Sequence, residues 1–302
     1  MNIKAEKIRK AMDAIKKERP DYGQILDLFG NIMIKQAEYL EKVKLKPLAI
    51  TKDAARAKLS EGEPLLSIDD FQIDQTNASQ LFRELCGILK SESEELSDGI
   101  ESIENALEKG DLNLEEVFQS VLELDYQFSE LAESLSLDMD TVLILVTMSI
   151  RPSLEATALQ AKDIVEDIAW SKHYCPVCGS SPAISELRQL KPDGVEESSA
   201  QGAERIFHCS FCGTEWRTMR LICAFCGNTD QESLRYLYSE SDRSYRIDVC
   251  DKCKRYIKTV DSREISYEIV PAVEDLATLH LDMVAEESGY KKEEGSMPYS
   301  GI

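Results

Sequence analysis

Eight of the nine cysteines form four identical Cys-x-x-Cys pairs, and no other residues in the chain are so clearly arranged for chemistry. The pairs are Cys175/Cys178, Cys209/Cys212, Cys223/Cys226 and Cys250/Cys253. One such pair, called a knuckle here, wraps a metal ion with two thiolates, so a closed tetrahedral site needs two knuckles. In a reducing compartment this repeated spacing indicates metal far more often than disulfides or redox dithiols. The sequence therefore predicts two metal sites, each with four cysteine ligands.

The spacing of the knuckles suggests which of them share an ion. Thirty residues separate Cys178 from Cys209 and 23 separate Cys226 from Cys250, and each stretch contains two strand-like runs around a polar turn. Only ten residues follow Cys212 before the third knuckle, room for one outgoing and one incoming strand. We therefore predict site 1 from Cys175, Cys178, Cys209 and Cys212, and site 2 from Cys223, Cys226, Cys250 and Cys253. A crossed arrangement, first knuckle with third, also satisfies the spacing.

The four cysteine ligands of each site limit which metal ions can bind there and what those ions can do. All-thiolate tetrahedral sites suit zinc and rubredoxin-type iron equally well. Four protein ligands leave no open position, which favours a structural or electron-storing role over Lewis-acid catalysis. The chain has no glycine-rich phosphate loop, no G-x-S-x-G and no H-E-x-x-H, and its three histidines offer few general bases. We expect no catalytic residues, no organic cofactor and no enzymatic activity.

Two histidines lie close to the knuckles. His173 and His208 are each within two residues of a cysteine and could replace a ligand. Because eight thiolates already complete two sites, we expect both to be surface or supporting groups. We also expect the third, His280, to be an exposed polar residue.

Other side chains near the cysteines have two possible interpretations. Trp216 is predicted to pack on its ribbon rather than to stack on a ligand. Arg217 and Arg220 either bind an acidic partner or neutralise the thiolates. Cys86, the unpaired cysteine, lies in an apolar helical stretch and is predicted to be a core residue.

The first 170 or so residues are predicted to be helical, because apolar residues recur at spacings of three and four. One stripe runs from Ile25 to Leu40, and another from Leu114 to Leu122 follows Asn113 as a helix N-cap. The pattern continues through 141–148 and 154–170, with Pro152 expected to start the second of these helices. Residues 46–70 hold Pro47, Gly62 and Pro64, and we expect a connection with one short helix.

The cysteine-containing half is predicted to be a small β structure. Strand-like runs cover residues 205–208, 234–238 and 245–249, and the polar stretch 191–204 resembles a loop between strands. A strand-like stretch at 265–270 precedes a helix over 272–288, which Gly289 would end. The predicted fold class is α+β: a helical domain (1–170), two tandem rubredoxin-like or zinc-ribbon modules (171–219 and 220–262), and a closing segment with a helix (263–302).

The charge and composition of the chain limit the kinds of partner and the cellular location that we expect. The formal net charge is −21, yet residues 171–258 hold 13 basic and 12 acidic residues, leaving 22 basic and 44 acidic residues elsewhere. Nucleic-acid binding needs a basic surface, so this charge distribution argues against DNA and RNA as partners. The longest apolar run, 141–150, is about half of the roughly 20 residues that a membrane span needs, so we predict that it forms a buried core helix. The N-terminus lacks the apolar region of a secretory signal, so we expect a cytoplasmic protein without membrane insertion.

The knuckle region resembles a known family. The runs HYCPVCGSSPAISEL, RIFHCSFCGTEWRTMRLICAFCGN and VCDKCKRYIKTVD, followed by VPAVEDLATLHLDMVAEESGY, are similar to the formate dehydrogenase accessory protein family, FdhE. The similarity reaches back to SIRPSLEATALQAKDIVEDIAW and covers roughly residues 149–290. The acidic loop 191–204 and the Met-Pro-Tyr-Ser tail depart from the family pattern.

The resemblance implies a function that composition and spacing do not show. Members of that family are cytoplasmic and bind the catalytic subunit of formate dehydrogenase during its maturation, and they carry rubredoxin-like centres with which iron is associated. By this resemblance the eight knuckle cysteines are the metal ligands and the protein is a maturation factor. Two alternatives remain: a rubredoxin-like electron-transfer or thiol-redox protein acting on a client enzyme, and a transcription-type zinc-ribbon adaptor. The sequence leaves the oligomeric state open.

Overall fold

A computed structural model of the chain describes residues 2–92, 94–123, 132–135, 137–166, 168–190, 202–239 and 242–293. Its first half is helical. The helices are α1 (Ile3–Glu18), α2 (Gly23–Leu40), α3 (Lys52–Glu61), α4 (Gln75–Lys90), α5 (Glu94–Lys109), α6 (Leu114–Glu123), α8 (Met139–Leu159) and α9 (Lys162–Glu166). Short 3-10 turns occupy Pro20–Tyr22 and Ile68–Asp70. The predicted helices around 25–40 and 114–122 and the connection with one short helix, α3, are confirmed.

Helix α8 is the centre of the helical part and packs against α2, α4, α5 and α6. By length and composition alone, α8 is long and apolar enough to cross a membrane, with a mean hydropathy of 1.4 over its most apolar 18 residues. However, 67% of these residues are buried within the fold. This is the pattern of a core helix. The prediction that 141–150 forms a buried core helix is therefore confirmed.

The expected helix start at Pro152 is wrong, because α8 continues through the proline without a break. A proline inside a helix removes one N–H donor and leaves the carbonyl four residues earlier without its partner. Here that carbonyl belongs to Met148, and the side-chain amide of Gln36 on α2 donates to it at 2.8 Å. A hydrogen bond from another helix thus replaces the missing one.

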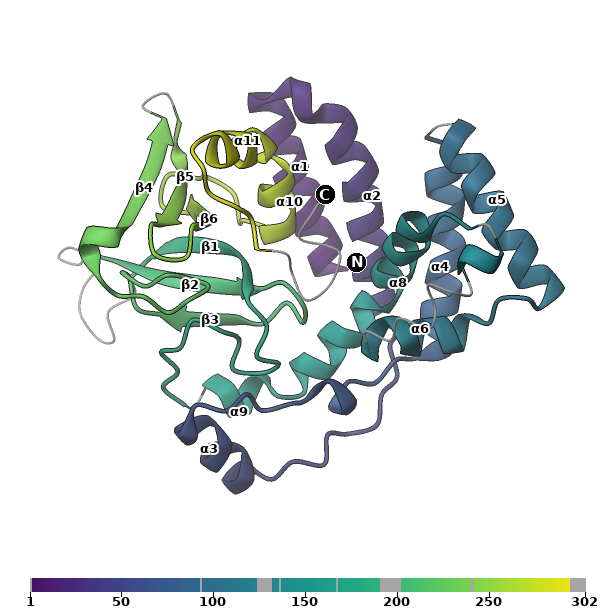
Figure 1. The fold of residues 1–302 in the computed structure, drawn as a ribbon, viewed down its shortest axis with the longest axis horizontal. Coiled ribbons are helices and arrows are strands. Elements are labelled where there is room, and N and C mark those ends of the chain that lie inside the picture. The colour runs from purple at the N-terminus through teal and green to yellow at the C-terminus, as the bar shows by residue number, and fades with distance from the viewer. Residues whose placement is uncertain are drawn as a thin grey trace.

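The second half forms one six-stranded sheet. Its strands are β1 (Pro182–Gln189), β2 (Ala203–Cys209), β3 (Glu215–Thr218), β4 (Leu234–Ser239), β5 (Asp242–Cys250) and β6 (Arg255–Asp261), in the order β3-β2-β1-β6-β5-β4. Strands β1–β3 and β4–β6 are antiparallel hairpin sets, and the parallel pair β1–β6 joins them. Figure 1 places these strands on one side of the molecule and α4–α6 on the other.

Each half of the sheet repeats the order knuckle, two strands, knuckle, strand. The strands predicted at 205–208, 234–238 and 245–249 are confirmed as parts of β2, β4 and β5. Between the second and third knuckles, where two strands were expected, the structure forms only β3. Most of the predicted loop 191–204, residues 191–201, lies outside the described residues.

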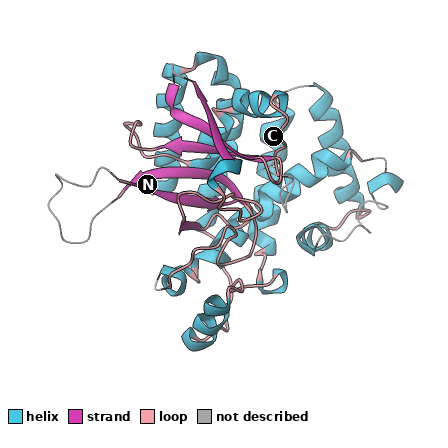
Figure 2. Ribbon diagram, turned by 60° about the vertical axis from the view of Figure 1, so that its left-hand side comes forward, coloured by secondary structure: helices cyan, strands magenta, loops and turns pink. Residues whose placement is uncertain are grey.

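The closing segment differs from the prediction in two places. Residues 265–270 form no strand; Ile265 and Ile269 instead pack onto a core beneath β5 and β6. The single helix expected over 272–288 is two, α10 (Pro271–Leu276) and α11 (Leu279–Glu287), and Gly289 follows with φ of 86°. Helix α10 joins an apolar core with α1 and α2, whereas α11 packs on β5 and β6. These two helices therefore connect the sheet to the helical part. Figure 2 shows the sheet (magenta) lying against helices (cyan).

The division of the chain into units at residues 170, 219 and 262 stays a prediction. The largest apolar core contains residues of the helices and of site 1 together, including Cys175, Phe207 and Trp216.

Candidate metal centre

The four knuckles come together in the two groups that the sequence predicted. Cys175, Cys178, Cys209 and Cys212 form one cluster, and Cys223, Cys226, Cys250 and Cys253 form the other, with every sulfur of a cluster within 4.8 Å of the others. The crossed arrangement of the first knuckle with the third is not the one formed.

The sulfur spacing fits one tetrahedral ion in each cluster. A metal with sulfur bonds of about 2.3 Å has sulfur–sulfur edges of about 3.8 Å in a regular tetrahedron. In the first cluster the Sγ atoms of Cys175 and Cys212 are 3.7 Å apart, and those of Cys178 and Cys209 are 3.4 Å apart. In the second, Cys223–Cys253 is 3.6 Å and Cys226–Cys250 is 3.8 Å. Each donor set could therefore hold one zinc or iron ion.

Backbone geometry explains why each knuckle forms. The residue directly after each pair has a positive φ, which lets its N–H turn back to the carbonyl of the first cysteine. Gly179, for example, donates to Cys175 at 2.9 Å, and Gly227 to Cys223 at 3.2 Å. Gly213 has the same conformation at the second knuckle, with φ of 72°. The fourth knuckle uses Lys254 at φ of 59°, a side chain in a conformation that favours glycine, and its N–H also donates to Cys250.

The first cluster lies at the junction with the helical part, where three of its cysteines are buried and Cys178 is partly exposed. The N–H groups of Leu65 and Leu66 donate to the carbonyls of Pro176 and Val177 in the first knuckle. Arg151 on α8 donates to the carbonyl of Ser210 in the second knuckle at 2.7 Å. Two segments of the helical part thus hold the two halves of site 1.

Aromatic packing reinforces that junction. Phe71 packs edge-on against Phe211, with ring centroids 4.9 Å apart. Burial raises the pKa of the Cys175 and Cys209 thiols, so a metal ion that binds them as thiolates must displace protons.

The second cluster lies at the surface. Cys226 is exposed and Cys253 is partly exposed, whereas Cys223 and Cys250 are buried. The side-chain amide of Asn228 supports the cluster by donating to the Cys250 sulfur at 3.8 Å. Site 2 is therefore the more accessible of the two sites to solvent, chelators and partner proteins.

The histidines contribute no ligand to either sulfur cluster within the described residues. The His173 ring lies against Gly227 of the third knuckle, where an added Cβ would be 2.7 Å from its Nδ1. His208 is buried, so of the two expected roles it has the supporting one, and its Nε2 lies 3.1 Å from Glu186. Burial opposes ionisation of Glu186, but hydrogen bonds from His208 and Arg188 bring its pKa down to about 2. His208 therefore joins β2 to a charged network on β1. His280 is exposed, as predicted.

The remaining predicted neighbours have clear positions. Trp216 is buried, packs edge-on against Phe207 and donates to the Lys172 carbonyl, which confirms its packing role. Arg217 pairs with Glu204, while Arg220 is exposed. Cys86 is buried in α4, and burial raises its pKa to about 12, which confirms a core thiol.

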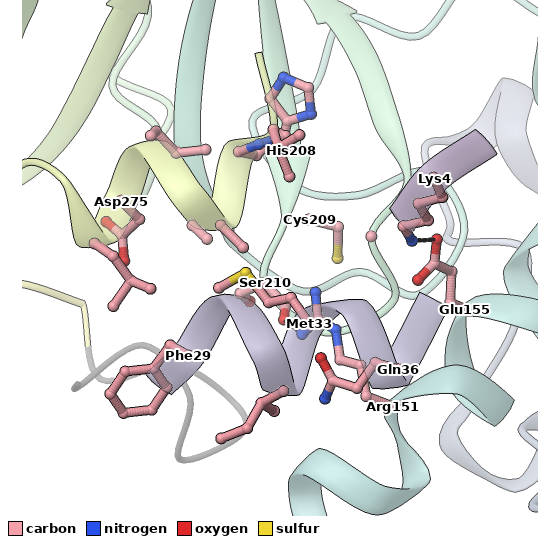
Figure 3. Close-up of a pocket in the computed structure, with 18 of the residues that line it drawn as sticks. Lys4, Phe29, Met33, Gln36, Arg151, Glu155, His208, Cys209, Ser210 and Asp275 are labelled. Atoms are coloured by element: carbon pink, nitrogen blue, oxygen red, sulfur yellow. Dashed lines mark hydrogen bonds and ion pairs between the residues drawn. The ribbon is translucent and has the colours of Figure 1, made fainter. Parts of the chain in front are cut away.

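Sequence reasoning did not find the cavity beside site 1. It has a volume of about 210 Å³ and lies between α2, α8, α10 and the start of β1. Its lining includes Cys209 and Ser210 of the second knuckle and Phe29 and Met33 of α2 (Figure 3). Lys4 and Glu155 form an ion pair at its edge. Cys209, one of the four cysteines of site 1, thus borders this cavity, which only the packing of distant elements creates.

Comparisons with known proteins find similarity to FdhE proteins. The family model described as "FdhE, C-terminal domain" matches residues 221–297, which include all of site 2, α10 and α11. The protein FdhE homolog of Aquifex aeolicus is 28% identical over 299 residues, covering 97% of this chain and 96% of that protein. The chain is therefore similar to FdhE proteins over almost its whole length.

Two other FdhE proteins match this chain over part of its length or by fold. FdhE of Escherichia coli K12 is 34% identical over 123 residues, 40% of this chain and 36% of that protein. The crystal structure of the FdhE protein from Pseudomonas aeruginosa covers 100% of this chain and 97% of that chain, with a TM-score of 0.65 at 18% identity. This last similarity shows that the FdhE fold extends over the helical part as well as the sheet.

Proposed function

We propose that this protein is an accessory factor for the maturation of formate dehydrogenase, that it acts in the cytoplasm, and that it binds the enzyme's catalytic subunit. The observation that carries the proposal is the FdhE match, which covers nearly the whole chain in the Aquifex aeolicus relative. The eight knuckle cysteines are the proposed metal ligands, and the ions would stabilise the sheet. With four protein ligands per ion, this role requires no catalytic residue.

The structure suggests how the two ions divide their roles. Site 1 joins the sheet to the helical part through hydrogen bonds to backbone carbonyls of both of its knuckles. Site 2 lies at the surface, with one ligand exposed. We infer that site 1 stabilises the junction, and that site 2 stabilises the part of the sheet available to a partner.

Deletion of the gene tests the proposed function. The deletion strain should lose formate dehydrogenase activity while the transcript of the catalytic subunit stays at its normal level, and the wild-type gene should restore activity. Normal activity in the deletion strain would refute the maturation role.

A second candidate, electron transfer or thiol redox chemistry on the client, is favoured by the exposed Cys226 of site 2. Iron at a rubredoxin-type site cycles one electron, and an exposed thiolate can exchange with a client disulfide. This function predicts a reversible change in iron–thiolate absorption. A colourless, zinc-loaded protein that complements the deletion would exclude it.

A further inference from the structure

Strand β4 is an edge of the sheet at the outer side of the molecule. Among the described residues it pairs only with β5, and Figure 1 shows it as the outermost strand. An edge strand leaves alternate N–H and C=O groups unpaired, and proteins usually protect such edges with charge or proline. The sequence of β4, Leu-Arg-Tyr-Leu-Tyr-Ser, has no proline, and its one charged side chain, Arg235, is paired with Asp251. This edge is therefore open to strand pairing.

The two faces of β4 have different surroundings. On one face, Leu237 packs partly against the core beneath α11, and Arg235 donates to the Tyr290 hydroxyl at 2.8 Å. Because side chains alternate along a strand, Tyr236 and Tyr238 lie on the opposite face. They are 57% and 59% exposed, with ring centroids 5.8 Å apart. An exposed tyrosine pair of this kind is typical of binding surfaces.

Arginines surround these tyrosines. Arg243 and Arg246 line a shallow groove of about 410 Å³ together with both rings, and the Arg246 guanidinium lies 5.0 Å from the centre of the Tyr236 ring. Arg220 lines the neighbouring pocket together with Tyr236 and Arg246. We call these five residues the tyrosine–arginine face.

The charge of this face is positive. Arg246 shares the carboxylate of Asp248 with the buried Arg205. Asp261, which lines the groove, pairs with Arg263. Arg220 and Arg243 have no ion pair within the described part of the chain, so the face keeps unbalanced positive charge on a protein whose net charge is −21. Guanidinium groups bind carboxylates in a two-pronged geometry, so this face is complementary to an acidic segment.

We propose that β4 binds an extended, acidic segment of the client protein, which adds to the sheet as a seventh strand and lays its side chains on the tyrosine–arginine face. The inference rests on the proposed function, since it takes the client to be the catalytic subunit of formate dehydrogenase. Backbone hydrogen bonds to β4 supply affinity, and the tyrosines and arginines select sequence. Leu234 pairs with Cys250, so the bound segment lies next to site 2.

The first test compares a triple variant with a matched control. Tyr236→Ser, Tyr238→Ser and Arg243→Glu remove two exposed apolar side chains and reverse one charge. The control, Met283→Ser, Val284→Ser and Arg9→Glu, makes the same kind of changes at exposed positions of α11 and α1. Both variants should keep the wild-type circular dichroism and metal content.

Titration calorimetry with the purified catalytic subunit gives the result. We expect the triple variant to bind at least about tenfold more weakly, as loss of central interface side chains does, and the control to bind within about twofold of wild type. Wild-type affinity in the triple variant overturns the inference and leaves the proposed function intact. If the wild-type protein itself does not bind the subunit, the proposed function fails, and this inference with it.

Hydrogen exchange tests the added strand separately from the side chains. Amides of β4 should gain protection when the catalytic subunit binds, while those of β3, the opposite edge, should not change. Binding without added protection in β4 overturns strand addition. Because the contact is charge-assisted, raising sodium chloride from about 0.1 to about 0.5 M should weaken wild-type binding more than binding of the triple variant.

Discussion

Removal of one knuckle of site 2 tests both the ligand assignment and the role of the metal. The perturbation is Cys223→Ser with Cys226→Ser, which takes away two of four ligands. Structural zinc contributes about 10–16 kcal/mol to small metal-dependent modules, whereas whole domains are stable by only about 5–15 kcal/mol. The apolar core near site 2 is small and centres on Ile247, Val249 and Tyr256. Loss of the ion should therefore unfold β4 and β5 locally.

The rest of the molecule should survive this change. Site 1 keeps its four cysteines and its bonds from Leu65, Leu66 and Arg151, and the helical core does not involve site 2 ligands. Metal analysis should find one ion per chain instead of two. Hydrogen exchange should show lost protection in β4 and β5 and unchanged protection in α4 and α8.

The matched control is Cys86→Ala, which removes a buried cysteine that belongs to neither cluster. It should cost about 1 kcal/mol of packing and keep both ions. Two ions per chain in the knuckle variant would show that the ligand assignment is wrong. One ion per chain with unchanged protection would show that site 2 does not stabilise the sheet.

Three further predictions follow from particular contacts. Gln36→Leu leaves the Met148 carbonyl without its donor and should lower the free energy of unfolding, measured with urea, by about 1–3 kcal/mol. In a Pro152→Ala background, the backbone N–H of Ala at position 152 can donate to that carbonyl, so Gln36→Leu should cost much less. Burial raises the pKa of Glu274 above its ordinary value of 4.5, so its ionisation favours the unfolded state. The stability that this group contributes should be complete below about pH 4.5 and should fall as pH rises through the folded-state pKa. The fall amounts to about 1.4 kcal/mol for each tenfold difference between the acid constants of the folded and unfolded states. In thermal melts measured across pH, Glu274→Gln should remove this fall. A chelator should strip site 2 before site 1, and alkylation mapped by mass spectrometry should label the exposed Cys226 before any site 1 cysteine.

Each of these three predictions would be contradicted by a particular experimental result. An equal cost of Gln36→Leu in both backgrounds would mean that the Gln36 amide does not substitute for the missing backbone bond. Parallel pH profiles of the wild-type and Glu274→Gln proteins would mean that this carboxyl is not a source of the pH dependence. Simultaneous labelling of both clusters would contradict the difference in their burial.

The grouping of the cysteines was predictable because it depends on short-range features. A Cys-x-x-Cys turn is specified within five residues, and the two longer gaps each contain a hairpin that returns the chain to its start. The apolar periodicity of α2 and α6 was equally local. These features need no knowledge of distant contacts.

The joined sheet and the unequal burial of the sites were not predictable in this way. The parallel pair β1–β6 aligns Ser185 with Thr259, and no local pattern specifies a partner that far along the chain. Site 1 is buried because Leu65 and Leu66, more than a hundred residues earlier, bond to its first knuckle. The continuation of α8 through Pro152 depends in the same way on Gln36.

The most direct test of the maturation account is an affinity pull-down of the tagged protein from its host's cytosol without oxygen, with bound proteins identified by mass spectrometry. The account predicts recovery of a formate dehydrogenase catalytic subunit, reduced in the site 2 knuckle variant and unchanged in Cys86→Ala. Recovery of RNA polymerase, or of no protein above background, would contradict it.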